Sequence, residues 1–363
     1  MRVLYDHQAF TIQNYGGISR YFFELTRQFQ SNSELTVIGS LLFSNNELIQ
    51  GNEIFSSTSF FKGFGSFQKK TELMNLLNEF KSKALLRRDD FDIFHPTYYD
   101  PYYLKGKSKK PIVITFHDLI HEKFKRSDHR TLAHKKRVLS LADRIIAVSQ
   151  SSKNDLMEYY GIEEERITVV HLASSITRPE DMIQEESKND YLLYVGNRGH
   201  YKNFTFFVRA IAPLLIKERN LFLYCAGGGC FTKEESMLFH ELHIENKVIL
   251  HAGNDASLAK MYSNAIALLF PSLYEGFGLP LLEAMSCGCP IGASQTSSLP
   301  EVANDAALYF NPYDKDSILS VAETLISKSD IRSTLTQKGF LRAQKFNWAK
   351  TAALTQQVYA SVV

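Results

Sequence analysis

The chain has 363 residues, of which 44% are hydrophobic and 22% are charged, and its formal net charge is +2. This composition argues against a disordered chain and against a strongly basic nucleic-acid-binding protein. A chain of this length exceeds one ordinary hydrophobic core, so two domains are expected.

The N-terminal stretch, the apolar runs and the cysteines indicate the expected cellular compartment. The N-terminal stretch reaches Asp6 and His7 too early for a signal peptide, and no run approaches the ~18 apolar residues of a membrane span. The four cysteines match no usual zinc spacing, and we expect buried free thiols in a reducing cytoplasm: Cys225, Cys230, Cys287 and Cys289.

The first half reads as alternating strands and helices. Apolar runs predict strands at 1–5, 35–43, 92–95, 111–116, 144–149 and 166–171. Gly16 and Gly17 open a helix predicted over 18–29, either as a simple turn or as a phosphate cradle. Ser149 is predicted to cap the helix that runs to Tyr160.

A basic amphipathic helix is predicted over 69–88. We expect its apolar positions to pack on their own domain, with membrane contact as the alternative: Leu73, Leu76, Leu77, Phe80, Ala84 and Leu85.

His117 and Asp118 follow the buried strand 111–116 at its carboxyl end. A histidine there is well placed to reach a ligand, and the alternative is a core histidine satisfied by Asp118. The next stretch, 121–137, carries seven Lys/Arg residues against two acidic residues. Such runs are usually solvated faces, and an anionic acceptor or a lipid headgroup is the other interpretation.

The polar, acid-rich segment 177–190 is the best linker candidate. A second series follows it, with strands predicted at 191–196, 221–226, 248–252, 265–270, 290–293 and 306–310, and with mostly helical structure over 315–363. Arg198 and Lys202 bracket the loop after the first of these strands, beside Gly196. Two cations near a glycine and a helix start would suit a diphosphate, or they are two surface charges.

Residues 270–290 predict a strand, a glycine loop and a helix. Glu275 to Leu279 forms a tight loop, Pro280 suits the first turn of a helix, and Gly288 stops it. This arrangement places free N–H groups beyond the carboxyl end of a parallel strand, where anionic ligands bind. Glu275 and Glu283 add carboxylates that suit the hydroxyl groups of a ribose or hexose, although a generic helix start explains the pattern too.

Two βα series of similar size predict two doubly wound α/β domains that face each other across a cleft. The predicted boundaries are 1–176 for the N-terminal domain, 177–190 for the linker and 191–345 for the second domain.

With these motifs, the chain resembles the retaining glycosyltransferases of family 4, which have the GT-B architecture of two facing Rossmann-like domains. Glu275 and Glu283 match the E-x7-E motif of that family. Supporting matches run along the whole chain in the expected order: Gly16–Gly17, His117–Asp118, the Val195–Arg198 stretch with Lys202–Asn203, and Ser298–Glu301. The resemblance is strongest to bacterial mannosyltransferase-like members that build O-antigen and other surface polysaccharides.

The resemblance implies a role for each matched residue. Glu283 would hold the ribose, Glu275 would face the donor sugar, and Arg198 and Lys202 would neutralise the diphosphate. His117 would contact the donor sugar near the reacting carbon, with Asp118 as its supporting partner. The remaining donor-binding residues would be Gly16, Gly17, Gly196, Gly276, Phe277, Gly278 and Leu279.

The resemblance also implies the reaction and its partners. The expected donor is a nucleotide sugar, GDP-mannose first and UDP- or dTDP-sugars second, with no cofactor and, in the absence of an Asp-x-Asp motif, no metal. The expected acceptor is a lipid-linked glycan, with peripheral contact to the inner membrane through basic N-domain segments. The C-terminal helix, 346–363, is expected to cross back to the first domain. A nucleotide-sugar epimerase and a non-catalytic sugar-nucleotide-binding subunit are the rival functions.

Overall fold

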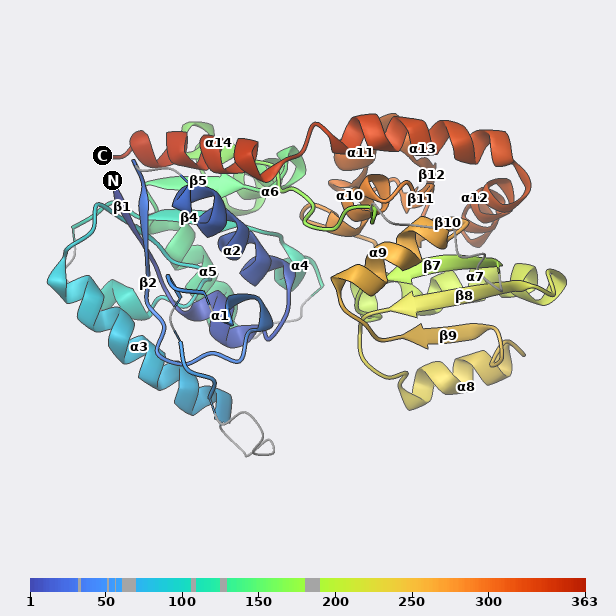
Figure 1. Ribbon diagram of the computed structural model, residues 1–363, viewed down its shortest axis with the longest axis horizontal. Coiled ribbons are helices and arrows are strands. Elements are labelled where there is room, and N and C mark those ends of the chain that lie inside the picture. The colour runs from blue at the N-terminus through green and yellow to red at the C-terminus, as the bar shows by residue number, and fades with distance from the viewer. Residues whose placement is uncertain are drawn as a thin grey trace. The chain divides into compact units, whose positions relative to one another are not determined.

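The computed structural model describes residues 1–31, 34–50, 52–55, 57–60, 70–105, 109–124, 129–179 and 190–363. The chain divides into two compact units (Figure 1). Unit 1 comprises Met1–Leu172 together with Trp348–Val363, and unit 2 comprises Ala173–Asn347. Most of the predicted linker, residues 180–189, lies outside the described residues.

Unit 1 contains two short parallel sheets. One has the order β2-β1-β3 and the other β4-β5-β6. A parallel bridge between Phe94 and Ile112 joins them into a continuous series. The strands are β1 (Arg2–Tyr5), β2 (Thr36–Gly39), β3 (Ile93–His95), β4 (Val113–Phe116), β5 (Arg144–Ala147) and β6 (Ile167–Val169). Each was predicted. Most are slightly shorter than the predicted run, and β2 ends four residues before its predicted end.

The helices of unit 1 connect these strands. They are α1 (Gln8–Ile12), α2 (Gly17–Gln30), α3 (Lys70–Arg88), α4 (Ile120–Lys123), α5 (His129–Leu141) and α6 (Gln150–Tyr160), joined by α14 (Trp348–Ala360) from the end of the chain. The predicted cap of α6 is confirmed, because the Ser149 hydroxyl accepts the N–H of Ser152 at 2.9 Å.

A buried polar network ties α14 to the sheet of unit 1. The Tyr359 hydroxyl lies 2.7 Å from His95 Nδ1 and 2.9 Å from the Tyr5 hydroxyl. His95 Nε2 lies 3.0 Å from Thr115 Oγ1, which also contacts the Tyr21 hydroxyl at 3.1 Å. Because these groups are fully or almost fully buried, each hydrogen bond replaces one otherwise made to water. The network fixes α14 beside α2 (Figure 1).

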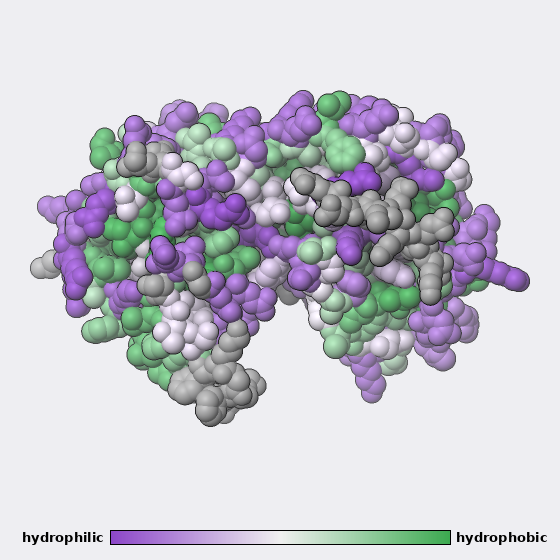
Figure 2. Space-filling model, in the orientation of Figure 1, coloured by the Kyte–Doolittle hydropathy of each residue, from purple (hydrophilic) through white to green (hydrophobic). Residues whose placement is uncertain are grey.

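The prediction for the buried face of α3 is wrong. The residues that it buries are Met74, Asn78, Ser82 and Leu86, whereas Leu76 and Phe80 are 63% and 72% exposed. Asn78 can occupy the inner face because its side chain accepts the N–H groups of Leu42 and Phe43 and donates to the Phe43 carbonyl. Apolar surface therefore remains exposed along α3 (Figure 2).

Unit 2 is built on a parallel sheet with the order β12-β11-β10-β7-β8-β9. Its strands are β7 (Asp190–Val195), β8 (Leu221–Ala226), β9 (Val248–His251), β10 (Ala267–Phe270), β11 (Ile291–Ser294) and β12 (Leu308–Phe310). β7 pairs with β8 on one side and with β10 on the other, so the chain reverses its direction of winding at this pair. This is the doubly wound topology that the sequence predicted.

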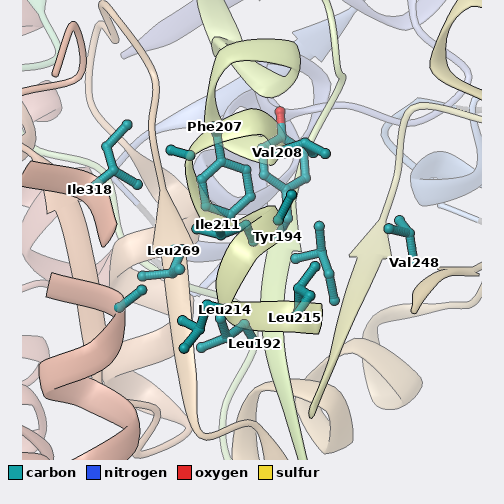
Figure 3. Close-up of a cluster of buried hydrophobic side chains, with 14 of the residues drawn as sticks. Leu192, Tyr194, Phe207, Val208, Ile211, Leu214, Leu215, Val248, Leu269 and Ile318 are labelled. Atoms are coloured by element: carbon teal, nitrogen blue, oxygen red, sulfur yellow. The ribbon is translucent and has the colours of Figure 1, made fainter. Parts of the chain in front are cut away.

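Helices pack on both faces of this sheet. On one face, α7 (Phe204–Lys217), α8 (Lys233–Glu241) and α12 (Lys315–Ser327) bury apolar side chains against the strands. Figure 3 shows this core, where Phe207 and Ile211 of α7 lie against Leu192 and Leu269 of the sheet. On the other face, α10 (Leu279–Ser286) contacts α9 (Asp255–Asn264), α11 (Leu299–Ala303) and α13 (Ser329–Ala343).

The cysteine prediction is correct for three of the four residues. Cys225, Cys287 and Cys289 are buried free thiols, whereas Cys230 is exposed. Cys230 follows the glycine turn at the end of β8, and a turn that projects beyond the sheet leaves its side chains in solvent.

Candidate functional site

The carboxyl ends of β7 and β10 form the topological switch point of unit 2, the usual ligand position of such sheets. Gly196 follows β7, and the loop that contains Glu275 follows β10. The two loops are joined, since the Leu273 N–H donates to the Tyr201 carbonyl at 2.7 Å. The sequence-predicted residues of both loops therefore meet at one edge of the sheet.

The loop after β10 is held in a defined shape. Gly278 has a φ of 104°, and a Cβ there would approach the Leu299 side chain to 2.7 Å, so only glycine fits without displacement. The Ser297 hydroxyl accepts the N–H of Glu275 at 2.8 Å. Ser298 is the N-cap residue of α11, but its hydroxyl caps no N–H group of that helix and donates to the carbonyls of Glu275 and Phe277. The loop thus presents Glu275 from a rigid support.

Lys202 and Glu275 form a buried ion pair. The Lys202 Nζ to Glu275 Oε1 distance is 2.6 Å, and the two residues are only 9% and 8% exposed. The ammonium also lies 5.0 Å from the centre of the Phe270 ring, at the end of β10. An ammonium has three donors, so Lys202 can hold Glu275 and still bind an oxygen of a ligand.

Glu283 lies in α10 and is held by a residue of α9. The Tyr262 hydroxyl donates to Glu283 Oε2 at 2.8 Å. Burial and the neighbouring carboxylate raise the pKa of Tyr262 well above its usual value, so the hydroxyl remains a donor at neutral pH. The bond fixes one carboxylate oxygen in place. A carboxylate oriented in this way suits a pair of vicinal hydroxyl groups.

Arg198 is surrounded by acceptors of its own unit. Its guanidinium pairs with Glu235 through Nε at 2.8 Å and donates to the carbonyls of Gly227, Gly229 and Cys230 at 2.7–2.9 Å. Gly227, Gly228 and Gly229 all have positive φ angles. The arginine therefore holds the glycine turn after β8, beside Gly196, and most of its donors are engaged within the protein.

In unit 1, His117 follows β4, as predicted. Its backbone N–H donates to the Tyr99 hydroxyl at 3.0 Å, and its Nε2 is buried without a hydrogen-bond partner among the described residues. Asp118 does not satisfy that nitrogen, and its Oδ1 accepts the N–H of Ile120. Burial and the Lys135 ammonium lower the pKa of His117 to about 3, so its imidazole is neutral.

Gly16 and Gly17 lie at the start of α2, also in unit 1. Gly16 is the N-cap residue and has an extended backbone, and Gly17 is exposed. The Gln13 side chain packs against Gly16 and accepts the N–H of Ser19 at 3.1 Å. One N–H of the first turn is thus already satisfied by the protein.

Several residues of these sites were not singled out from the sequence. Ser297, Tyr262 and Glu235 in unit 2, and Tyr99 and Lys135 in unit 1, contact predicted site residues from distant positions. Single-sequence patterns contain no signal for such pairings, since each residue type is also common on ordinary surfaces. Within the described ranges, no group of three His, Cys, Asp or Glu side chains could hold a metal ion. Nor does any described helix combine the length and apolar character that crossing a bilayer requires.

Two family models match the chain in succession. Residues 15–174 match the family described as "Glycosyltransferase Family 4", and residues 177–342 match "Glycosyl transferases group 1". Together they span most of the chain.

Individual proteins agree with the family matches. The chain is 28% identical to O-antigen chain mannosyltransferase B of Escherichia coli, over 94% of this chain and 95% of that protein. It is 31% identical to O-antigen chain mannosyltransferase RfbU of Salmonella typhimurium, over half of each chain. Among solved structures, Anabaena HepE in complex with UDP and glucose matches 99% of both chains with a TM-score of 0.78 and 16% identity, which shows a shared fold.

Proposed function

Since the chain belongs to glycosyltransferase family 4 and has the GT-B fold, we propose that it transfers mannose from GDP-mannose, with retention of configuration, to a growing surface polysaccharide such as O-antigen. The observation that carries the proposal is the buried Lys202–Glu275 pair at the switch point of unit 2. The names of the mannosyltransferase relatives support the choice of sugar.

In this proposal the residues of unit 2 hold the donor. Glu283, oriented by Tyr262, binds the ribose hydroxyls, and Glu275 faces the sugar. The loop of residues 276–279 supplies backbone N–H groups to sugar and phosphate oxygens. It leads into α10, and the first N–H groups of a helix lack intrahelical acceptors. Gly196 allows the chain to approach the diphosphate closely.

Two cations serve the diphosphate in different ways. Lys202 contacts it, because the ammonium keeps donors available beside Glu275. Arg198 adds its positive charge to the site and holds the glycine turn with its N–H groups. This division replaces the two equivalent phosphate ligands expected from the sequence.

The chemistry follows from charge development. As the bond between the sugar carbon and the diphosphate oxygen breaks, positive charge grows on the sugar and negative charge on the leaving group. Lys202 and the oriented N–H groups stabilise the leaving group. The acceptor hydroxyl forms the new bond on the face that the diphosphate leaves and gives its proton to a phosphate oxygen. The neutral imidazole of His117 contacts the sugar, and Gly16 and Gly17 approach the phosphates.

The acceptor is a lipid-linked glycan in this proposal, reached by peripheral contact with the inner membrane. The exposed Leu76 and Phe80 of α3, with Lys83 and Arg87 on the same helix, support such contact. A Leu76→Ser/Phe80→Ser variant should sediment less with vesicles that contain anionic lipid. A Met237→Ser/Leu341→Ser variant, which changes exposed apolar residues of unit 2, is the control. Equal binding of both variants would contradict this membrane surface.

The test of the donor is a melting-temperature screen with GDP, UDP, dTDP, ADP and CMP. A ligand that binds only the folded state raises the melting temperature by mass action, by an amount that reports its affinity. A selective shift with GDP, lost in Glu283→Ala, supports the proposal. A selective shift with UDP or dTDP keeps the transferase and replaces the donor. No shift with any of them would point to the non-catalytic rival, and turnover of the nucleotide sugar to an isomer without any acceptor would point to the epimerase.

A further inference from the structure

Unit 1 buries a lysine that the proposed reaction does not use. Lys135 of α5 is 1% exposed, although the sequence places it in the basic run expected to be a solvated face or a headgroup site. Its Nζ lies 3.0 Å from Glu122 Oε1, and both side chains are almost fully buried. A buried charge is costly unless it is paired and hydrogen-bonded, so this arrangement requires a compensating benefit.

The ammonium is fixed from several directions. It donates to the backbone carbonyl of Asp118 at 2.6 Å and lies about 5 Å from the ring centres of Tyr99 and Phe116. Glu122 also accepts a hydrogen bond from the Tyr160 hydroxyl of α6. The cluster therefore joins α4, α5 and α6 to the end of β4.

All of these contacts converge on the turn that carries His117. Phe116 precedes it, Asp118 follows it, and the Tyr99 hydroxyl accepts its backbone N–H. The imidazole Nε2 is buried and has no hydrogen-bond partner among the described residues. Since the backbone is held on both sides of His117, the direction of the imidazole is set by the cluster.

We propose that Lys135 is a positioning residue for His117: through the Asp118 carbonyl and Glu122, it fixes the turn that aims the imidazole at the donor sugar. The proposal rests on the proposed function, in which His117 contacts that sugar. Lys135 itself touches no substrate.

The charge of Lys135 also helps to keep the imidazole of His117 neutral. It adds to burial in lowering the pKa of His117, and the other titratable groups near the ring are Tyr21 of α2, Tyr99, Asp118 and His95 of β3. A neutral imidazole does not oppose the positive charge that develops on the sugar.

The experiment compares three variants: His117→Ala, the double variant Lys135→Met/Glu122→Gln, and the triple variant that combines them. The double variant removes the cation without leaving a buried carboxylate unpaired, and Tyr160 can still donate to the amide oxygen that replaces the carboxylate. Turnover is measured with the nucleotide sugar that the melting screen selects. Circular dichroism and the nucleotide-induced melting shift report whether each variant is folded.

We expect the double variant to keep its nucleotide-induced melting shift and to lose about 10- to 100-fold in kcat, with a smaller change in KM for the donor. The triple variant should be no slower than His117→Ala, because Lys135 acts through His117. As the pH is lowered, the double variant should also lose activity at a higher pH than the wild type does, since its imidazole protonates more easily.

The inference would be overturned if the kcat losses of His117→Ala and of the double variant multiplied in the triple variant. It would also be overturned if the double variant kept full kcat and an unchanged pH profile. Full activity of His117→Ala, beside an inactive Glu275→Ala, would also overturn it and would leave the transferase proposal standing. An active Glu275→Ala would instead refute the proposed site of unit 2.

Discussion

The two units share a parallel, doubly wound plan but fill their switch points differently. In unit 1, the point between β1 and β3 is occupied by the fully buried carboxylate of Asp6, which accepts hydrogen bonds from Gln8, Thr97 and Tyr102. In unit 2, the point between β7 and β10 is lined by Gly196 and the Lys202–Glu275 pair. Protein donors fill the first edge, whereas Lys202 at the second edge has N–H donors beyond the one that Glu275 accepts.

Topology alone does not make a ligand site. A carboxylate surrounded by donors of its own domain has little capacity left for a substrate, and its function is to hold loops together. A lysine that uses one of its donors on a glutamate retains the others. Substitutions at the two edges should therefore differ in their consequences, with loss of turnover at the edge of unit 2 and loss of stability at the edge of unit 1.

The largest effect is expected for Glu275→Ala in unit 2. Loss of the carboxylate removes a contact to the donor sugar and frees Lys202 from its only ion-pair partner among the described residues, so we expect kcat to fall about 1,000-fold or more. The measurement is donor turnover at a temperature where the variant is folded. Glu241→Ala is the control, since Glu241 pairs with the exposed Arg209 on the surface of the same unit. Wild-type turnover by Glu275→Ala would remove the distinction between the two edges.

Asp6→Asn should affect unit 1 through stability. In the wild type, protein donors point at the carboxylate oxygens of Asp6. The asparagine amide would place an N–H group opposite some of these donors, so we expect a loss of about 3 kcal/mol in unfolding free energy. Denaturant unfolding measures the loss. The nucleotide-induced melting shift should persist, because the groups that hold the nucleotide in the proposal belong to unit 2. A variant of wild-type stability that loses turnover would show that this edge also serves the reaction.

The sequence predicts the local units of the fold well. The strand, glycine loop and helix around Glu275 were placed within two residues, because Gly278 and Pro280 have conformational requirements that only this arrangement meets. The outward face of α3 was not predicted correctly. Asn78 breaks the apolar pattern, and the hydrogen bonds that make it a good inner residue come from segments far away in the sequence.

The details of the site depend on such distant contacts. Lys202 and Glu275 were both identified, but nothing in their spacing of 73 residues indicates a 2.6 Å ion pair. Arg198 was identified too, and its acceptors within the protein are mostly backbone carbonyls, which every residue possesses. Residue types and motifs reveal which groups take part, and only tertiary structure reveals how their hydrogen-bonding capacity is divided.

A smaller effect on the stability of unit 1 is expected when the pH is lowered. His7, His95 and His117 of unit 1 have lowered pKa values, chiefly through burial, to about 3 for the last two. The unfolded chain therefore binds more protons than the folded chain between pH 6.5 and 3, and stability falls as the pH decreases through that window. Between pH 6.5 and 5.5, His95 and His117 should each lower the free energy of unfolding by about 1 kcal/mol, as denaturant unfolding would measure. A His95→Asn variant should show a shallower slope, and an equal slope would contradict the assignment.

The smallest effect is expected for Tyr359→Phe. The change removes the hydrogen bonds to His95 Nδ1 and to the Tyr5 hydroxyl but keeps the ring, so unit 1 should lose about 1–2 kcal/mol. In the sequence, α14 is separated from the rest of unit 1 by the whole of unit 2. Without this network, a protease should therefore cleave α14 earlier than the remainder of unit 1 in limited proteolysis. Tyr313→Phe, at an exposed tyrosine of unit 2, is the control and should leave cleavage unchanged. If Tyr359→Phe instead reduced turnover while α14 stayed protected, the buried network would serve the reaction, and the contrast between a structural edge and a ligand-binding edge would no longer hold.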